Sequence, residues 1–491
     1  MTRVVVDPAR SLGSLSRNVF GGFVEHLGRC IYGGVYDEGS PLGDERGFRR
    51  DVLELLRELR VSVLRWPGGN FVSNYHWVDG IGPKDERPRR PELAWHAEES
   101  NRFGTDEFVA YCRALGAEPY ICLNMGTGSL EEALAWIEYC NGEGATAWAE
   151  RRRRNGSEEP YGIRWWGLGN EMYGSWQVGA LSAEEYVAEA TRWARAIRML
   201  DPRAKLVACG QSGWEDWDRV VVDGLSPHVD LHAIHIYTGS SDYWTNVLQP
   251  HQAERAIACA RALIARAAYV QQIADPPRIA YDEWNVWYRR HDDTLEERYD
   301  ISDALAVGTY LNIFVRNCAW VRMANLAQLV NAIAPVVTTA ETAAVQPIYY
   351  PVLLHARAAL DEAVDVWVDG AKVEDPGPLD DSRWAHRIDD LAPFDLVDAA
   401  ATVDTRRSRL ALTLVNRSTE PEPVEIVLRD RGFEGDVALH LVTGESEGAE
   451  RAIADVERAT VEQATAPASG STAAFELPAS SFVLLEGTLA A

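Results

Sequence analysis

The stretch YGIRWWGLGNEMYG, residues 161–174, has the pattern of a short buried strand that ends in an acidic residue. Apolar and aromatic residues run together over 163–168, and helix-breaking glycines lie among and beside them. The predicted strand ends at Asn170 and Glu171. Apolar surroundings raise the pKa of a carboxyl group, which suits a general acid. The alternative is a surface glutamate that caps the next loop.

Strands and helices alternate outward from this stretch in both directions. Eight segments have the composition of strands and are each followed by a helical pattern: 18–26, 61–66, 118–125, 163–171, 205–209, 231–237, 278–284 and 326–333. They are apolar on both faces, which is typical of a parallel sheet covered by helices. The pattern predicts a (β/α)₈ TIM barrel with long loops. A doubly wound open sheet is less favoured, because the first turn lacks a G-x-G-x-x-G fingerprint.

The pattern changes after about residue 365. Short strand-like runs then alternate with turns: 365–373, 410–415, 424–428, 437–441 and 482–485. This predicts an all-β sandwich of jelly-roll-like type, which we interpret as structural support in preference to a sugar-binding domain. We expect residues 1–17 to supply an N-terminal strand to the sandwich, 18–362 to form the catalytic barrel, and 363–491 to form the sandwich.

Composition limits the partners of the chain. The formal net charge of −26 argues against nucleic acid and anionic membranes and suits a neutral substrate. The sequence has no apolar run long enough to span a membrane and no signal-peptide pattern at its start. Its seven cysteines are scattered without metal-ligand spacing. We therefore expect a cytoplasmic protein with reduced thiols, no metal and no cofactor.

Two glutamates lie at the ends of predicted barrel strands. Catalytic residues of such barrels come from the carboxyl ends of the strands. Glu171 ends the fourth strand and Glu283 the seventh, so we expect them to face each other across the barrel mouth. Glycoside hydrolysis needs such a pair, one acid to protonate the leaving oxygen and one carboxylate to attack or stabilise the anomeric carbon.

Their neighbours divide the two roles. Arg65 and the hydroxyl of Tyr237, at the ends of two other strands, are expected to hold Glu283 ionised as the nucleophile. Taken alone, Arg65 fits a structural ion pair equally well. Glu171 has aromatic neighbours and no nearby cation in the sequence, so we predict a raised pKa and the role of acid/base. Asn170 and Gln346 offer donors and acceptors for sugar hydroxyls.

The remaining candidates have open interpretations. His235 is interpreted as a buried core histidine. Trp95 and Trp287 are either stacking platforms for sugar rings or packing residues of the barrel rim.

Four motifs resemble those of the α-L-arabinofuranosidases of glycoside hydrolase family 51. They are WGLGNE at 166–171, YDEWN at 281–285, GGFVEHLGRCIYGG at 21–34 and LRWPGGNFVSNYHW at 64–77. The resemblance spans residues 18–360. The Asn-Glu pair alone would indicate only clan A, the wider clan of retaining barrel glycosidases.

The resemblance implies a role for each candidate residue. Glu171 corresponds to the acid/base and Glu283 to the nucleophile. The other matching positions are the hydroxyl-binding Glu25, Asn70, Asn170 and Gln346, the nucleophile-orienting Arg65 and Tyr237, and the cleft aromatics Trp95 and Trp287. It also implies a barrel with a β-sandwich, retention of configuration, no metal and a hexamer.

The leading hypothesis is an intracellular, retaining, exo-acting α-L-arabinofuranosidase that removes terminal residues from arabinose-containing oligosaccharides. Another retaining clan A glycosidase, a β-xylosidase or an endoglucanase, is the closest alternative. A non-catalytic carbohydrate-binding protein is the alternative from a different class, but binding alone does not need two opposed carboxylates.

Overall fold

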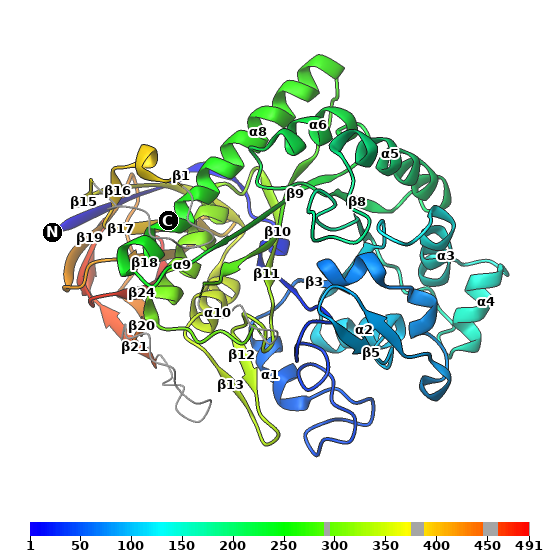
Figure 1. The fold of residues 1–491 in the computed structure, drawn as a ribbon. Coiled ribbons are helices and arrows are strands. Elements are labelled where there is room, and N and C mark those ends of the chain that lie inside the picture. Colours follow the sequence, from blue (N-terminus) through cyan, green and yellow to red (C-terminus); the bar gives the residue numbers. More distant parts are fainter. Residues whose placement is uncertain (289–294, 375–386, 445–459, 491) are drawn as a thin grey trace.

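The computed structural model describes residues 1–288, 295–374, 387–444 and 460–490. A closed barrel of eight strands and a ten-stranded sheet account for most of the strands in these ranges (Figure 1). All pairs within the barrel are parallel. The predicted (β/α)₈ barrel with a C-terminal β-sandwich is therefore confirmed.

Short, buried strands form the wall of the barrel. In chain order they are β2 (Gly21–Phe23), β3 (Val63–Trp66), β6 (Glu118–Leu123), β7 (Trp165–Leu168), β8 (Lys205–Ala208), β9 (Leu231–Thr238), β10 (Arg278–Val286) and β11 (Val321–Ala327). Both faces of these strands are covered, which is why their sequences read as continuous apolar runs.

Helices surround the barrel, as Figure 1 shows. They are α1 (Arg50–Glu58), α2 (Thr105–Leu115), α3 (Leu130–Asn141), α4 (Ala147–Arg154), α5 (Ala183–Leu200), α6 (Asp216–Leu225), α7 (Tyr243–Leu248), α8 (Gln252–Gln271), α9 (Ile301–Arg316) and α10 (Tyr349–Ala358). Local sequence sets several starts. Ser182 and Glu185, for example, form a capping box that satisfies free N–H groups at the start of α5. In the described ranges no helix combines the length and apolar character needed to cross a membrane.

The eighth barrel strand differs from the prediction. We expected it at 326–333, but β11 begins at Val321 and ends at Ala327. Two polar residues, Arg322 and Asn325, interrupt the apolar run, so the segment lacks the sequence pattern of a buried strand. Asn325 is buried because its side-chain amide donates to the carbonyl of Gly22 at 2.9 Å, which joins β11 to β2.

The sandwich takes its strands from both ends of the chain. In spatial order they are β21 (Thr460–Ala466), β20 (Val437–Thr443), β24 (Ser481–Thr488), β18 (Arg409–Asn416), β17 (Val397–Val403), β14 (Glu362–Asp369), β1 (Thr2–Ser14), β19 (Glu422–Leu428), β23 (Thr472–Leu477) and β22 (Ala468–Ser469). β1 pairs antiparallel with β14 and parallel with β19. A separate apolar core, which includes Val4, Leu412 and Leu485, fills this domain.

A buried polar cluster joins the barrel to the sandwich through α9. The carboxylate of Asp398, on β17, lies 3.0 Å from Arg316 and accepts a hydrogen bond from Asn312 at 2.7 Å. Arg417 lies 3.8 Å from the same carboxylate. Burial raises the pKa of Asp398, but the two arginines outweigh it and lower the pKa to about 2. We call these four residues the interface cluster.

Candidate active site

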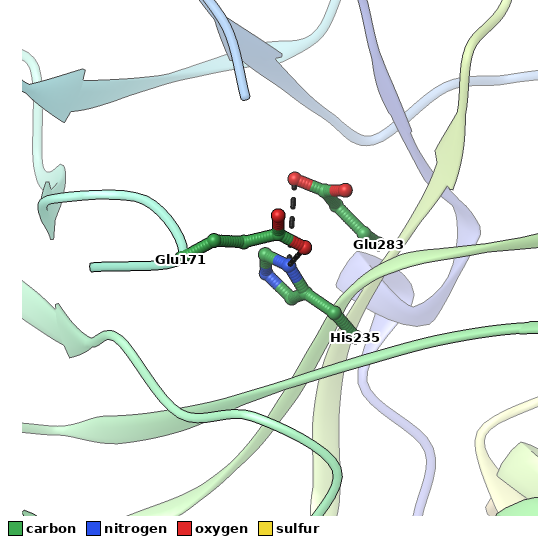
Figure 2. Close-up of side chains that lie close together, drawn as sticks. All are labelled: Glu171, His235 and Glu283. Atoms are coloured by element: carbon green, nitrogen blue, oxygen red, sulfur yellow. Dashed lines mark hydrogen bonds and ion pairs between the residues drawn. The ribbon is translucent and has the colours of Figure 1, made fainter. Parts of the chain in front are cut away.

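Three side chains from different strands meet at the mouth of the barrel. Figure 2 shows Glu171, which follows β7, with His235 of β9 and Glu283 of β10. One carboxylate oxygen of each glutamate and a ring nitrogen of His235 lie within 4.8 Å of one another. Retaining glycosidases hold their two carboxyl groups about 5 Å apart, because one of them attacks the anomeric carbon directly. The geometry therefore fits a double displacement.

The carboxylate of Glu283 is held at both of its oxygens. Arg65 donates from Nη1 to Oε1 at 2.7 Å, and the hydroxyl of Tyr237 donates to Oε2 at 2.8 Å. Arg65 also donates to the side-chain oxygen of Asn170 at 2.6 Å. Arg65 and Tyr237 are the partners that the sequence predicted for Glu283, and their two hydrogen bonds fix the orientation of its carboxylate.

Glu171 sits on a backbone turn that suits few side chains. Its φ of 43° lies in the left-handed region, and such strain in a non-glycine residue persists where the surroundings enforce it. Oε1 lies 3.0 Å from Nδ1 of His235, and Oε2 accepts a hydrogen bond from the indole of Trp176 at 3.1 Å. The turn thus leaves one oxygen facing the cluster and one facing outward.

The predicted raised pKa of Glu171 is wrong. Burial raises the pKa of this carboxyl, but the contacts with His235, the Trp176 indole and the charge of Arg65 lower it below its ordinary value. His235 is 64 residues away in the sequence, so the aromatic neighbours of Glu171 were visible and its cation was not.

His235 is buried, as expected, but it belongs to the site rather than to the apolar core. Its Nδ1 faces Glu171 and lies 3.5 Å from Glu283, while its Nε2 lies 3.2 Å from Asp282. Burial lowers the pKa of His235, but these carboxylates raise it to about 10. The ring is therefore an imidazolium at neutral pH.

Asp282, within the YDEWN motif, is a site residue that the sequence pattern did not predict. It accepts a hydrogen bond from the hydroxyl of Tyr120 at 2.8 Å, and Arg65 lies 3.7 Å away. Burial raises the pKa of Asp282, but Arg65 and His235 together lower it. Neighbouring residues of a regular strand point to opposite faces. The register of β10 shifts between Ala280 and Glu283, and this irregularity lets Asp282 and Glu283 reach one cluster.

Glu25 forms a second, less charged part of the site. One of its oxygens accepts from the backbone of Phe71 and the indole of Trp95, both at 3.1 Å. The other oxygen accepts from Gln328 at 3.1 Å. Burial and the nearby charge of Glu283 raise the pKa of Glu25 to about 8. The carboxyl is therefore mostly neutral at pH 7.

The other predicted binding residues have different surroundings. Asn170 donates to the side-chain oxygen of Asn70 at 3.5 Å, a long contact at the same mouth. Trp95, Trp287 and Tyr237 pack against one small apolar cluster, with the rings of Tyr237 and Trp287 nearly perpendicular. Gln346 is buried, and its amide bonds to backbone groups of Glu297, Tyr299 and Ala334. Its predicted role in binding hydroxyls stays a prediction.

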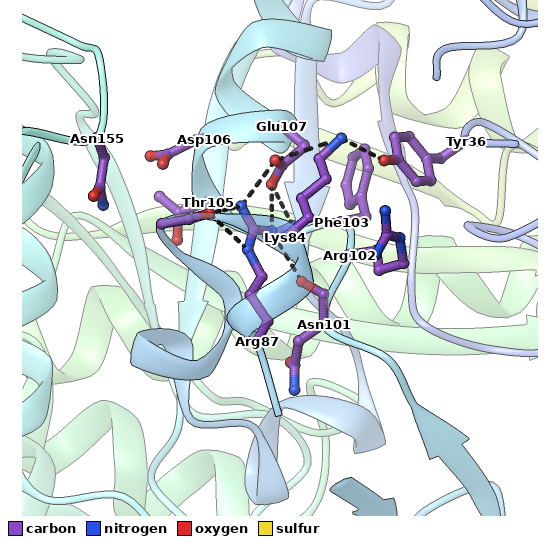
Figure 3. Close-up of polar contacts among 12 residues, drawn as sticks. Tyr36, Lys84, Arg87, Asn101, Arg102, Phe103, Thr105, Asp106, Glu107 and Asn155 are labelled. Atoms are coloured by element: carbon purple, nitrogen blue, oxygen red, sulfur yellow. Dashed lines mark hydrogen bonds and ion pairs between the residues drawn. The ribbon is translucent and has the colours of Figure 1, made fainter. Parts of the chain in front are cut away.

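An ion pair anchors the loop that carries Trp95. This loop contains the hairpin of β4 (Arg90–Glu92) and β5 (Ala97–Glu99). At its base Arg87 donates to both carboxylate oxygens of Glu107, at 2.9 and 3.0 Å, and to the carbonyl of Asn101 at 2.9 Å (Figure 3). Bidentate pairs of this kind fix orientation as well as distance. The anchor therefore helps to hold Trp95 against Glu25.

In the described part of the chain, the one group with the spacing of metal ligands is Glu171, His235 and Glu283. A histidine must be neutral to bind a metal ion. The three carboxylates around His235 instead favour its protonated form. These residues fit acid–base chemistry better than they fit a metal centre.

A TIM barrel with two opposed carboxyl groups at its mouth defines a retaining glycoside hydrolase. Residues 55–255 match the family model of the alpha-L-arabinofuranosidase 1 domain, and 282–481 match that of the alpha-L-arabinofuranosidase C-terminal domain. The chain belongs to the α-L-arabinofuranosidases of glycoside hydrolase family 51.

Named relatives span nearly the whole chain. A probable α-L-arabinofuranosidase C of Aspergillus fumigatus is 44% identical, over 90% of this chain and 89% of the relative. The intracellular exo-α-(1→5)-L-arabinofuranosidase 1 of Bacillus subtilis is 35% identical over the same shares. The structure of a thermostable family 51 α-L-arabinofuranosidase from Thermotoga petrophila superposes with a TM-score of 0.90, at 39% identity, and covers 99% of this chain and 100% of that one.

Proposed function

We propose that the protein is an exo-acting α-L-arabinofuranosidase that releases terminal, non-reducing α-L-arabinofuranosyl residues from arabinose-containing oligosaccharides with retention of configuration. The observation that carries the proposal is the pair of glutamates whose carboxylate oxygens come within 4.8 Å of each other at the barrel mouth. The relative in Bacillus subtilis, named as an exo-α-(1→5)-L-arabinofuranosidase, supports the choice of substrate.

In the first half of the reaction, Glu283 attacks the anomeric carbon and forms a glycosyl ester. Arg65 and Tyr237 aim the attacking carboxylate. Glu171 supplies a proton to the departing oxygen, which leaves as an alcohol.

In the second half, Glu171 acts as a base. It takes a proton from water, and the resulting hydroxide attacks the anomeric carbon from the face that the leaving group vacated. The ester breaks and Glu283 returns as a carboxylate. Two inversions at one carbon give net retention.

The sugar is held by the polar groups beside Glu283. Glu25, with its pKa of about 8, can donate a hydrogen bond to a sugar hydroxyl at neutral pH as well as accept one. Asn70 and Asn170 offer amide groups at the same mouth. Trp95 and Trp287 form apolar walls at the rim, and the strongly negative chain suits a neutral ligand.

The biological setting is part of the proposal. We propose a cytoplasmic enzyme of L-arabinose metabolism that acts on fragments of hemicellulose and assembles as a homohexamer. Light scattering coupled to size-exclusion chromatography tests the assembly, since a hexamer has six times the 54.5 kDa mass of the chain. A monomeric mass would contradict it.

A panel of nitrophenyl glycosides tests the substrate class. We expect kcat/KM for the α-L-arabinofuranoside to exceed that for the β-D-xylopyranoside and the β-D-glucopyranoside by at least about 100-fold, because a site built for one sugar leaves polar groups unpaired with another. A preference for the β-xyloside would favour the β-xylosidase alternative. Failure of every glycoside to react would favour a binding protein.

A further inference from the structure

We propose that His235, oriented by Asp282, stores the proton that Glu171 delivers to the leaving group, and that the charge of His235 changes in step with the charge of Glu283. The proposal rests on the double displacement described above. It makes His235 and Asp282 positioning residues that act through Glu171.

The contacts of the imidazole assign a separate role to each ring nitrogen. Nε2 lies 3.2 Å from the buried carboxylate of Asp282, which Tyr120 and Arg65 hold in place. The negative charge of this carboxylate favours a proton on Nε2 through electrostatic attraction. Nδ1, 3.0 Å from Oε1 of Glu171, is then the nitrogen that exchanges a proton with the catalytic acid (Figure 2).

Charge around the imidazole is not balanced. The ionisable groups that face it are Glu171 beyond β7, together with Asp282 and Glu283 on β10. Arg65 of β3 bonds to Glu283 and lies near Asp282. Among these residues three carboxylates share one arginine, and protonated His235 is the second cation. Removing one negative charge from this group weakens the hold on the histidine proton.

The first half of the reaction removes that charge. When Glu283 forms the glycosyl ester, its carboxylate becomes neutral. The proton on Nδ1 of His235 passes by way of the Glu171 carboxyl to the departing oxygen, and the bond between that oxygen and the anomeric carbon breaks. His235 is then neutral, Glu171 is still an anion, and the four residues His235, Glu171, Asp282 and Glu283 keep the same total charge.

The second half restores the first state. Glu171 takes a proton from water, hydroxide adds to the anomeric carbon, and the ester bond to Glu283 breaks. The proton returns to Nδ1 of His235 because Glu283 is again an anion. Glu171 is thus a carboxylate in both resting states, which reconciles its lowered pKa with its role as an acid.

Histidine NMR tests the coupling without any substrate. The protein is labelled with ¹⁵N-histidine, and the resonances of His235 are identified by their loss in His235→Asn. Glu283→Gln replaces the anion by a neutral group of the same shape and mimics the charge of the ester. We expect the pKa of His235 to fall by at least about one unit, a tenfold loss of proton affinity, because a charged neighbour shifts a pKa by about 1–3 units. Equal pKa values in the two proteins would overturn the proposal.

A pH profile tests the role of Asp282 in catalysis. Loss of the stored proton sets the basic limb of kcat/KM, so Asp282→Asn should move this limb to lower pH by about one unit or more. The matched control is Asp218→Asn. Asp218 and His232 form a buried pair with a 2.8 Å contact, and His232 is on the same strand as His235. The control is expected to leave the limb in place.

The two kinds of failure are distinguishable. An unmoved basic limb in Asp282→Asn would overturn the proton store while leaving the arabinofuranosidase assignment intact. Loss of the assignment itself would show in the glycoside panel. If Asp282→Asn does not fold, the NMR comparison of the native protein with Glu283→Gln still tests whether the charge of His235 follows the charge of Glu283.

Discussion

The active site and the interface cluster are both built from buried carboxylates and arginines, but their charges are shared differently. At the interface, Asp398 has Arg316 and Arg417 beside it, and Arg316 also meets Glu254 at 3.1 Å. When Glu254 is counted with the interface cluster, two carboxylates there face two arginines. At the barrel mouth three carboxylates share one arginine and one histidine.

This difference separates a structural cluster from a chemical one. With equal charges, each group at the interface has one stable protonation state, and the cluster only joins two domains. With an excess of acid, the proton on His235 depends on the charge of its neighbours. Burial and a shifted pKa occur in both places, so neither alone identifies the functional site.

The largest effect is expected from breaking the pair of catalytic glutamates. Glu283→Ala removes the nucleophile and should lower kcat by about 10⁴-fold or more, since no other group can form the ester. Glu171→Ala should spare aryl substrates with good leaving groups, because these need little protonation. Steady-state kinetics with a series of leaving groups measures both.

Rescue by azide tests which glutamate is the acid/base and which is the nucleophile. In Glu171→Ala, azide should attack the accumulated glycosyl ester and give a product of retained configuration. In Glu283→Ala, azide should attack the substrate directly and give the inverted product. NMR of the glycosyl azides reads the outcome, and the reverse pattern would exchange the two roles.

Breaking the interface cluster should cost stability rather than activity. Asp398→Ala leaves Arg316 and Arg417 buried with too few partners, and such unpaired charges destabilise a protein by about 3–5 kcal/mol. Denaturant unfolding measures this loss. We expect kcat/KM at 25 °C to change less than about threefold, and a large loss would mean that the two clusters are coupled.

The stability contributed by the interface cluster is also expected to depend on pH. The pKa of Asp398 is about 2 in the folded protein and about 4 in an unfolded chain, so its stabilisation is complete above pH 4 and is lost as the pH falls towards 2. The stability difference between the native protein and Asp398→Asn should therefore narrow by about 1 kcal/mol between pH 5 and pH 3. A difference that stays constant would show that the charge of Asp398 contributes nothing.

The smallest expected effect is that of removing metal ions. The acid–base interpretation of Glu171, His235 and Glu283 predicts that exhaustive treatment with EDTA leaves kcat/KM unchanged. Activity that falls and returns with added zinc would assign the three residues to a metal instead. A matched sample treated with zinc-loaded EDTA controls for effects of the chelator itself.

Much of this arrangement was readable from the sequence because it follows from regular structure. Apolar runs revealed most of the barrel strands, and the rule that catalytic residues follow strand ends selected Glu171 and Glu283. Contacts that depend on irregular structure were not readable. The register shift in β10 brings Asp282 beside Glu283, and a single strand gives no sign of it.

Long-range electrostatics were equally hidden. Burial raises the pKa of Glu171, but a histidine from another strand lowers it. The aromatic sequence around the glutamate had predicted a raised pKa. The eighth strand was misplaced for a related reason. The polar side chain of Asn325 is accommodated in the barrel wall because it donates to the carbonyl of Gly22 on β2, the first strand of the barrel. The two residues are far apart in the sequence, so this contact can be recognised only in the closed barrel.

The place of β1 in the sandwich has a consequence for how the protein is made. Thr2–Ser14 leaves the ribosome before the barrel, but its partners β14 and β19 are synthesised only after the entire barrel. Until then its hydrogen-bonding edges are unpaired, which is the condition under which strands associate with other chains. A nascent chain that stalls after the barrel, or a gene truncated there, would therefore yield a product prone to aggregation even with every catalytic residue in place.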